Sequence, residues 1–137
     1  MDYEKLRQYR EESIRFTQRL GITIDEIRHG YARVSKTVCS EDLNSLNRAH
    51  GGVYFTIADA AAGSAMASYG YTAMTLSGNY NFYRAASDGD RITAEAHGLK
   101  RGRTVSVFDV RLTDQNSKLL GSGTFSFYQL EDPLEIS

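Results

Sequence analysis

Apolar and polar residues at the start of this chain recur with the period of an amphipathic helix. One face carries side chains spaced alternately by three and four residues: Leu6, Tyr9, Ser13, Phe16 and Leu20. Gly21 follows at a position where helices commonly end in a left-handed residue. We therefore predict a packing helix over residues 2–20, within an N-terminal segment that ends at residue 21.

The next segments alternate with the two-residue period of β-strands. Ile22–Asp25 and Tyr31–Val38 are separated by His29 and Gly30, a turn sequence that would join two strands into a hairpin. After Gly70 the alternation returns, interrupted by short polar turns. It predicts four further strands, over residues 73–84, 91–99, 104–113 and 118–130.

Two details of these later strands bear on the site. In the strand 73–84 one face would be apolar, with Met74, Leu76, Tyr80 and Phe82, and the opposite face would be polar, with Thr75, Ser77, Asn79 and Asn81. In the strand 104–113 the apolar phase shifts between Val107 and Phe108, which predicts a bulge there. Residues 100–103 would form a tight hairpin loop.

The middle of the chain combines a glycine pair with a carboxylate in an apolar, alanine-rich segment. Gly51 and Gly52 open a segment that reads as a helix over residues 49–69, and Asp59 lies in its apolar body. Each glycine costs a helix about 1 kcal/mol relative to alanine, which suggests that something approaches the backbone closely. The simpler interpretation is a capping glycine and a solvated acid, which is plausible for either feature alone but less so for the pair.

This order of elements predicts an α+β fold. Strands joined by short turns are antiparallel neighbours, and a helix of low polarity must be covered to be buried. We expect a single domain over residues 1–137, in which a curved antiparallel sheet wraps around one long central helix, with an extra N-terminal helix.

Composition excludes several classes of function. The 137 residues carry a net charge of −1, which gives no electrostatic footprint for nucleic acid or for an anionic membrane surface. No apolar run approaches the roughly 20 residues of a membrane span. The start of the chain, MDYEKLRQYREESIRF, does not resemble a signal peptide, and Cys39 is the single cysteine. We expect a cytoplasmic protein.

The glycine and the acid cannot serve one substrate within one chain. Eight residues of α-helix span roughly 12 Å. If both features are chemical, they must come from two copies of the helix, as in a two-fold dimer with antiparallel helices. The amide of Gly51 at the helix N-terminus would polarise a carbonyl, and Asp59 of the other copy would attack that carbonyl or activate water. Without a Ser-His pair or a metal cluster, a thioester is the plausible electrophile.

The segment Asn44–Asp59 resembles the signature of hotdog-fold acyl-CoA thioesterases, closest to the phenylacetate-pathway (PaaI-like) branch. The shared pattern is Asn-x5-His-Gly-Gly-x6-Asp, and similar segments lie around Asn81–Ala86, Gly89-Asp90 and Gly102–Thr104. The resemblance covers roughly residues 25–130. Asn47 stands where many relatives have glycine, and asparagine tolerates the left-handed dihedral angles expected there.

Carried over by position, the resemblance implies a set of roles. Asp59 would be the nucleophile or general base, and the Gly51 amide would polarise the thioester carbonyl. Asn44 would hold that carbonyl or the attacking water. A hydroxyl on the following strand would assist the acid, with Thr75 as first candidate and Ser77 as the alternative. The resemblance also implies a homodimer at least, with a dimer of dimers as the expected assembly.

The remaining candidates concern binding of the acyl-CoA substrate; no other cofactor and no metal is expected. His50 and Gly52 adjoin the predicted site, although His50 is more simply read as shaping the turn. Four basic residues could meet the CoA phosphates, or could be ordinary solvated charges: Arg84, Lys100, Arg101 and Arg103. The acyl group stays open.

Two other functions fit the same fold. A non-catalytic acyl-CoA-binding hotdog module would not require Asp59. A hotdog dehydratase would need a catalytic histidine paired with an acid, and the turn typical of those enzymes is absent. The sequence therefore favours hydrolysis of an acyl- or aryl-CoA thioester.

Overall fold

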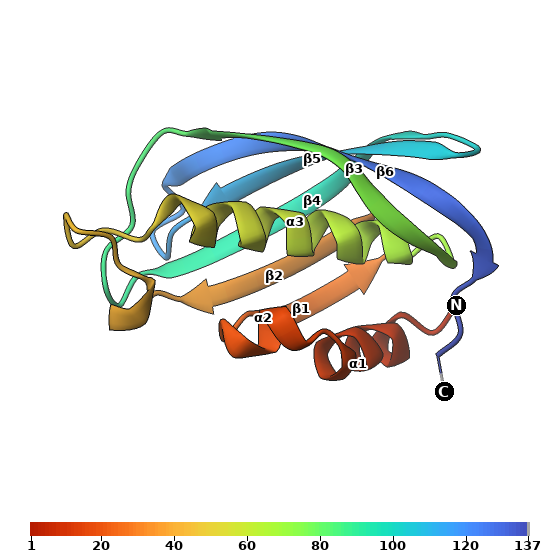
Figure 1. The fold of residues 1–137 in the computed structure, drawn as a ribbon, viewed down its shortest axis with the longest axis horizontal. Helices are drawn as coiled ribbons and strands as arrows, with labels where there is room; N and C mark the ends of the chain where they lie inside the picture. The colour runs from red at the N-terminus through yellow and green to blue at the C-terminus, as the bar shows by residue number, and fades with distance from the viewer. Residues whose placement is uncertain (137) are drawn as a thin grey trace.

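The computed structural model describes residues 1–136 and has the predicted α+β architecture (Figure 1). The elements in chain order are α1 (Tyr3–Ser13), α2 (Arg15–Arg19), β1 (Thr23–Arg28), β2 (Tyr31–Thr37), the 3-10 turn η1 (Ser40–Asp42), α3 (Gly51–Ala67), β3 (Tyr71–Phe82), β4 (Arg91–Arg101), β5 (Val105–Thr113) and β6 (Leu119–Pro133). The six strands form one sheet in the order β1-β2-β4-β5-β6-β3, and every neighbouring pair is antiparallel.

The sheet curves around α3, which contacts all six strands. Small residues allow this close packing: Ala58, Ala61, Ala62 and Ala65 of α3 are fully buried. Large side chains from the sheet, such as Phe108 and Phe125, fill the remaining space. The predicted hotdog fold, with a long central helix and an additional N-terminal helical segment, is confirmed. None of the helices in residues 1–136 has both the length and the apolar character needed to cross a membrane.

The N-terminal segment differs from the single helix predicted over residues 2–20. It is broken at Ile14, whose φ of −90° and ψ of 103° are extended. The Ser13 hydroxyl bonds back to the carbonyl of Tyr9 at 2.6 Å, a contact that bends helices. The Gln18 side chain then donates to the carbonyls of Glu11 and Glu12, which satisfies acceptors at the end of α1. Gly21 has the left-handed φ of 71° expected after the helix.

The predicted faces of β3 are wrong because a bulge interrupts the strand. Thr75 pairs with Phe127 and Ser77 pairs with Ser126, so Leu76 is an extra residue. Met74 and Leu76 are 61% and 55% exposed, whereas Tyr80 is buried. A side chain at Gly78 would clash with Phe55 and Phe125 in the interior, so Ser77 next to it faces the other way.

The bulge predicted between Val107 and Phe108 of β5 lies in the partner strand β4 instead. Gly98 pairs with Phe108 and Lys100 with Val107, which makes Leu99 the extra residue. The strand β5 itself alternates regularly, with Ser106, Phe108, Val110 and Leu112 all fully buried. Because β4 continues to Arg101, Lys100 and Arg101 belong to the strand and the turn begins at Gly102. The prediction failed because β5 also has apolar residues on its outward face, such as Val105, and these interrupt the alternation of apolar and polar residues in the sequence.

Candidate active site

The helix α3 begins with a cap supplied by its own preceding histidine. The Nδ1 atom of His50 accepts a hydrogen bond from the Gly52 amide at 2.9 Å, and the His50 amide donates to the Asp42 carbonyl at 2.8 Å. The Gly51 amide, in contrast, has no acceptor among residues 1–136. His50 therefore shapes the turn, as expected, and the amide of Gly52, proposed as a binding group, is already used inside the chain.

Asn44 shapes the loop that precedes this cap. Its Oδ1 accepts hydrogen bonds from the amides of Leu46 at 2.9 Å and Arg48 at 3.1 Å, which leaves the Nδ2 group to donate elsewhere. Asn47 has a φ of 58°, the left-handed value predicted for it. Asn44 and Gly51 line one cleft of about 380 Å³, together with Tyr54, Phe82, Tyr83 and Arg84 among others. We call this the amide cleft.

A buried ion pair holds the loop that precedes α3, and it was not identified from the sequence. Lys36 Nζ lies 3.0 Å from Asp42 Oδ2, and both side chains are about 95% buried, with exposures of 4% and 5%. Burial raises the pKa of Asp42, but hydrogen bonds from the Cys39 amide and from Lys36 outweigh it and lower the pKa below its usual value. Since the Asp42 carbonyl also holds the His50 amide, this pair anchors the start of α3.

Asp59 lies in a different cleft of about 410 Å³, between α3, the N-terminal helices and the strands β3 and β6. We call this the carboxylate cleft. The hydroxyl of Thr75 donates to Asp59 Oδ1 at 3.1 Å. Burial raises the pKa of Asp59, and the Thr75 hydrogen bond and the nearby charge of Arg10 oppose that rise only in part. Thr75, not Ser77, is therefore the hydroxyl that meets the acid.

Arg10 is a cleft residue that sequence analysis missed. It projects from α1, and its Nε donates to the buried Ser64 Oγ of α3 at 3.2 Å. Burial lowers its pKa to about 10, against the opposing effect of the Asp59 charge. Arg10 follows Leu6 by four residues, so both lie on the same face of the N-terminal helix. This spacing was the one sequence feature that indicated an inward-facing arginine.

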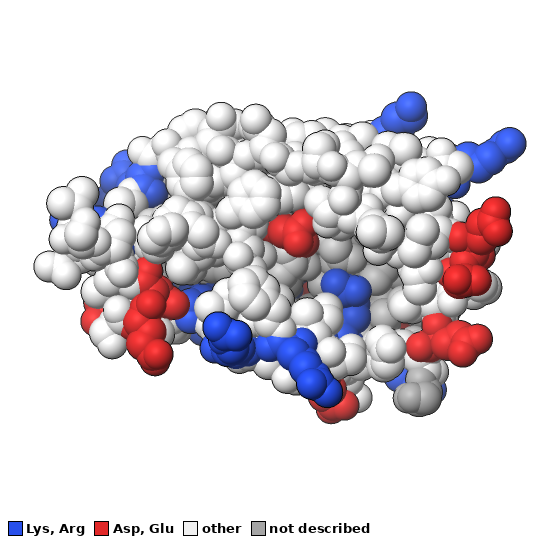
Figure 2. Space-filling model, viewed as in Figure 1, with Lys and Arg blue, Asp and Glu red and all other residues white. Residues whose placement is uncertain are grey.

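One chain does not bring the two halves of the predicted site together. Asp59 and Thr75 line the carboxylate cleft, whereas Asn44, Gly51 and Arg84 line the amide cleft. Gly51 and Asp59 are eight residues apart on one helix, roughly 12 Å along its axis. Figure 2 shows the surface over the central helix as largely uncharged, with an acidic side chain in its middle.

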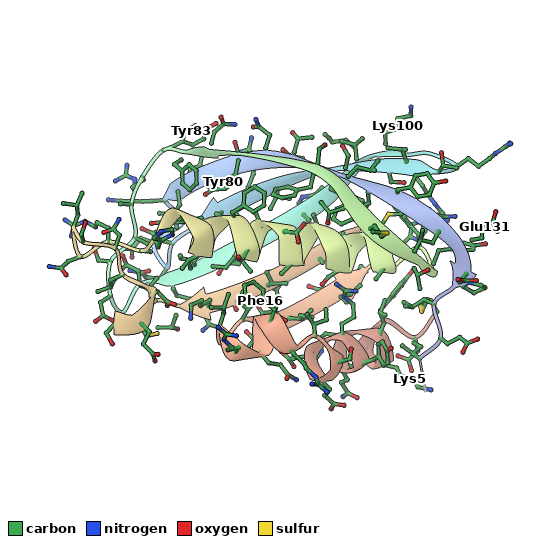
Figure 3. The ribbon with its side chains drawn as sticks, in the orientation of Figure 1. Lys5, Phe16, Tyr80, Tyr83, Lys100 and Glu131 are labelled. Atoms are coloured by element: carbon green, nitrogen blue, oxygen red, sulfur yellow. The ribbon has the colours of Figure 1, made fainter. Side chains whose placement is uncertain are left out.

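The other predicted phosphate-binding residues lie far from the amide cleft. The Arg101 guanidinium lies 4.3 Å from the ring centroid of Tyr69, which lies two residues after the last residue of α3. Figure 3 shows Lys100 and Tyr83 toward opposite ends of the molecule. Arg103 lies in the adjacent turn. No three His, Cys, Asp or Glu side chains within residues 1–136 form a group able to hold a metal ion.

Comparison with known proteins identifies the family of this chain. The family model of the thioesterase superfamily matches residues 46–120. The acyl-coenzyme A thioesterase PaaI of Escherichia coli K12 is 34% identical over 99 residues, which cover 72% of this chain and 71% of that protein.

Solved structures give the same result. The E. coli PaaI protein from the phenylacetic acid degradation operon superposes with a TM-score of 0.91 at 27% identity and covers 97% of this chain and 99% of its own. A thioesterase protein from Streptococcus pneumoniae TIGR4, solved with coenzyme A, has a TM-score of 0.78 at 30% identity over 81% of this chain and 87% of its own. The chain therefore belongs to the thioesterase superfamily, in its PaaI-like hotdog branch.

Proposed function

We propose that the protein hydrolyses an acyl- or aryl-CoA thioester to the free acid and CoA. The observation that carries the proposal is the environment of Asp59: a carboxylate with a raised pKa, held by Thr75 in a cleft next to uncharged surface. A carboxylate whose pKa is raised by burial is better suited to accept a proton than an exposed one. A module that only binds acyl-CoA would have no use for such a group.

The catalytic site would form between two subunits. A two-fold pair with antiparallel α3 helices would place the Gly51 amide of one subunit against Asp59 of the other, twice. The strand β3 fits a role in this pairing because it is an edge strand and exposes Met74 and Leu76. Exposed apolar edge strands in native proteins are normally paired or covered. A homodimer is thus the smallest active unit, and a dimer of dimers is the expected assembly.

Two chemical routes lead to the same products. In the first, Asp59 takes a proton from water while the water oxygen bonds to the thioester carbon; the C–S bond then breaks and the CoA thiolate receives the proton. In the second, a carboxylate oxygen bonds to the carbon and expels the thiolate, and water hydrolyses the resulting anhydride. In both routes the Gly51 amide, and the Nδ2 group of Asn44, would donate hydrogen bonds to the oxygen that gains charge.

The CoA phosphates would lie at the amide cleft. Arg84 is available there within the same chain. The hairpin with Lys100, Arg101 and Arg103 is at the C-terminal end of α3, where Arg101 stacks on Tyr69. In an antiparallel pair of helices, the partner's hairpin would approach the N-terminal end of this α3, so the two sets of basic residues could act together.

The assignment of Asp59 and Thr75 has support from the S. pneumoniae thioesterase. That protein has also been solved with one aspartate replaced by alanine and, separately, with one threonine replaced by alanine. These two positions are 16 residues apart, the same separation as Asp59 and Thr75.

The test is thiol release from a panel of aryl- and alkyl-CoA thioesters. We expect Asp59→Asn to lose at least about 100-fold in kcat, since it removes the group that takes the proton or attacks. Asp88→Asn is the matched control because Asp88 is exposed in the turn before β4. Binding of CoA thioesters without hydrolysis by the wild type would instead support the non-catalytic module.

A further inference from the structure

Arg10 places a positive charge in the carboxylate cleft, and the proposed hydrolysis does not require it there. The residue belongs to α1, outside the segment 46–120 that matches the thioesterase family model. Its guanidinium lines the cleft next to Gly63 of α3; Nη2 lies 3.4 Å from the position that a Cβ at Gly63 would take. The cation is therefore supplied by the N-terminal helices, from outside the segment that carries the family pattern.

The charge of Arg10 has no carboxylate partner in the part of the chain that the structure describes. Only its Nε is engaged, by Ser64, and no acid among residues 1–136 comes within 4.0 Å, Asp59 included. Arg7 on the same helix differs, because it pairs with both Glu4 and Glu11. Burying a cation without a partner is costly, and its two terminal amino groups are left to donate.

The distance between Asp59 and Arg10 fits a short acyl chain. Gly63 follows Asp59 by four residues, roughly 6 Å along the helix axis. Ala60 and Gly63 present almost no side chain along this path, and Phe127 and Leu134 add apolar surface to the same cleft. Phe16 lies between α2 and α3 beside it (Figure 3). A few methylene groups would span this path from the reacting carbonyl to the guanidinium.

We propose that the acyl group hydrolysed by this protein ends in a carboxylate, which Arg10 binds through its two free amino groups. The inference rests on the proposed thioesterase activity and names the substrate class of that site. The planar fork of a guanidinium matches the two oxygens of a carboxylate, and such hydrogen bonds are among the strongest in proteins. Arg10 would also offset the repulsion between this carboxylate and Asp59.

The test compares pairs of thioesters that have equal chain length and differ only in the terminal carboxylate: glutaryl-CoA with pentanoyl-CoA, and adipyl-CoA with hexanoyl-CoA. The measured quantity is the ratio of kcat/KM within a pair, because an effect of Arg10 on Asp59 or on folding cancels in that ratio. We expect the wild type to prefer the carboxylate substrate and Arg10→Met to lower the ratio by about 10- to 100-fold.

Two further variants sharpen the comparison. Arg10→Lys keeps the charge without the fork and should retain part of the preference. Arg15→Met removes an exposed arginine of α2 and should leave the ratio at the wild-type value. A wild-type preference for the neutral substrates, or an equal loss on both members of a pair in Arg10→Met, would overturn the proposal. Failure of the wild type to hydrolyse any thioester would instead overturn the proposed function itself.

Discussion

The pKa of Asp59 depends on two neighbouring side chains and on burial. The hydrogen bond from Thr75 and the positive charge of Arg10 both lower its pKa, while burial raises the pKa by more than they remove. The carboxylate therefore gains its proton at a higher pH than an exposed aspartate does. Hydrolysis that depends on the ionised form must decline as the pH falls through this raised pKa.

This balance predicts the effect of removing the Thr75 hydroxyl. Thr75→Val has a similar shape and cannot donate to Asp59, so the pKa of Asp59 should rise further. The acidic limb of the profile of kcat/KM against pH should move to higher pH, with a loss of about 10-fold in rate on the plateau. Ser77→Ala is the control, because Ser77 faces away from the acid. If the acidic limb of the pH profile moves in Ser77→Ala and stays in place in Thr75→Val, Thr75 is not the hydroxyl that acts on Asp59.

At the scale of the elements, the start of α3 depends on the buried pair of Lys36 and Asp42. Asp42 accepts from the Cys39 amide at 2.9 Å through its side chain and from the His50 amide through its carbonyl. Lys36 Nζ also donates to the Leu20 carbonyl, which follows α2. The pair thus ties the N-terminal helices, β2 and the loop before α3 to one another.

Removing only one charge of this pair should lower the free energy of unfolding more than removing both charges. Lys36→Met leaves Asp42 as an uncompensated buried charge and should lower the free energy of unfolding by about 3 kcal/mol. The double variant Lys36→Met/Asp42→Asn should recover part of that loss, as urea denaturation would measure. If the losses of Lys36→Met and Asp42→Asn, measured separately, simply add up in the double variant, the two side chains do not interact.

Elements of this fold could be predicted from the sequence where a local pattern determines them. The hairpin at Gly30 and the helix after His50 follow from periodicity and turn residues. The position of β3 does not, because the short turn after it predicts that β3 lies beside β4, whereas β3 pairs with β6 at the edge of the sheet. The break at Ile14 could not be predicted in this way, because it depends on side chains of Ser13 and Gln18 that bond to the backbone of α1. The bulge at Leu76 depends on the register between β3 and β6, which no single segment specifies.

In the candidate site, too, some residues could be predicted from local sequence patterns and others depend on tertiary packing. Gly51 and Asp59 lie on α3, Asn44 lies in the loop before it and Thr75 lies on the strand after it, so all four belong to one continuous part of the chain. Arg10 comes from a distant part of the chain and reaches the cleft only through tertiary packing onto Ser64. Sequence position alone gives no reason to pair an arginine of the first helix with this site.

At the scale of the whole molecule, the central claim is that each active site combines the amide cleft of one subunit with the carboxylate cleft of the other. The two clefts are separate in one chain, and both are lined by residues of α3. A test must therefore disable each half independently. Asp59→Asn disables the carboxylate half.

Gly51→Pro disables the amide half with little other change. Proline lacks the backbone N–H and is well accepted at the first position of a helix. His50 before it has a φ of −63° and a ψ of 143°, a conformation that residues preceding proline favour. A side chain at Gly51 would stand 3.5 Å from the Phe82 ring, an ordinary contact. Gly51→Ala keeps the amide and is the matched control, so it should retain most of the activity that Gly51→Pro loses.

The most direct measurement is the thioesterase activity of a mixture of Gly51→Pro and Asp59→Asn chains, refolded or co-expressed so that subunits exchange. Each variant alone should be nearly inactive. A mixed dimer has one site with both halves intact and one with neither, so random pairing at equal amounts should restore about a quarter of the wild-type activity. If mixed dimers form but the activity stays at the sum of the two parents, the site is not shared between subunits.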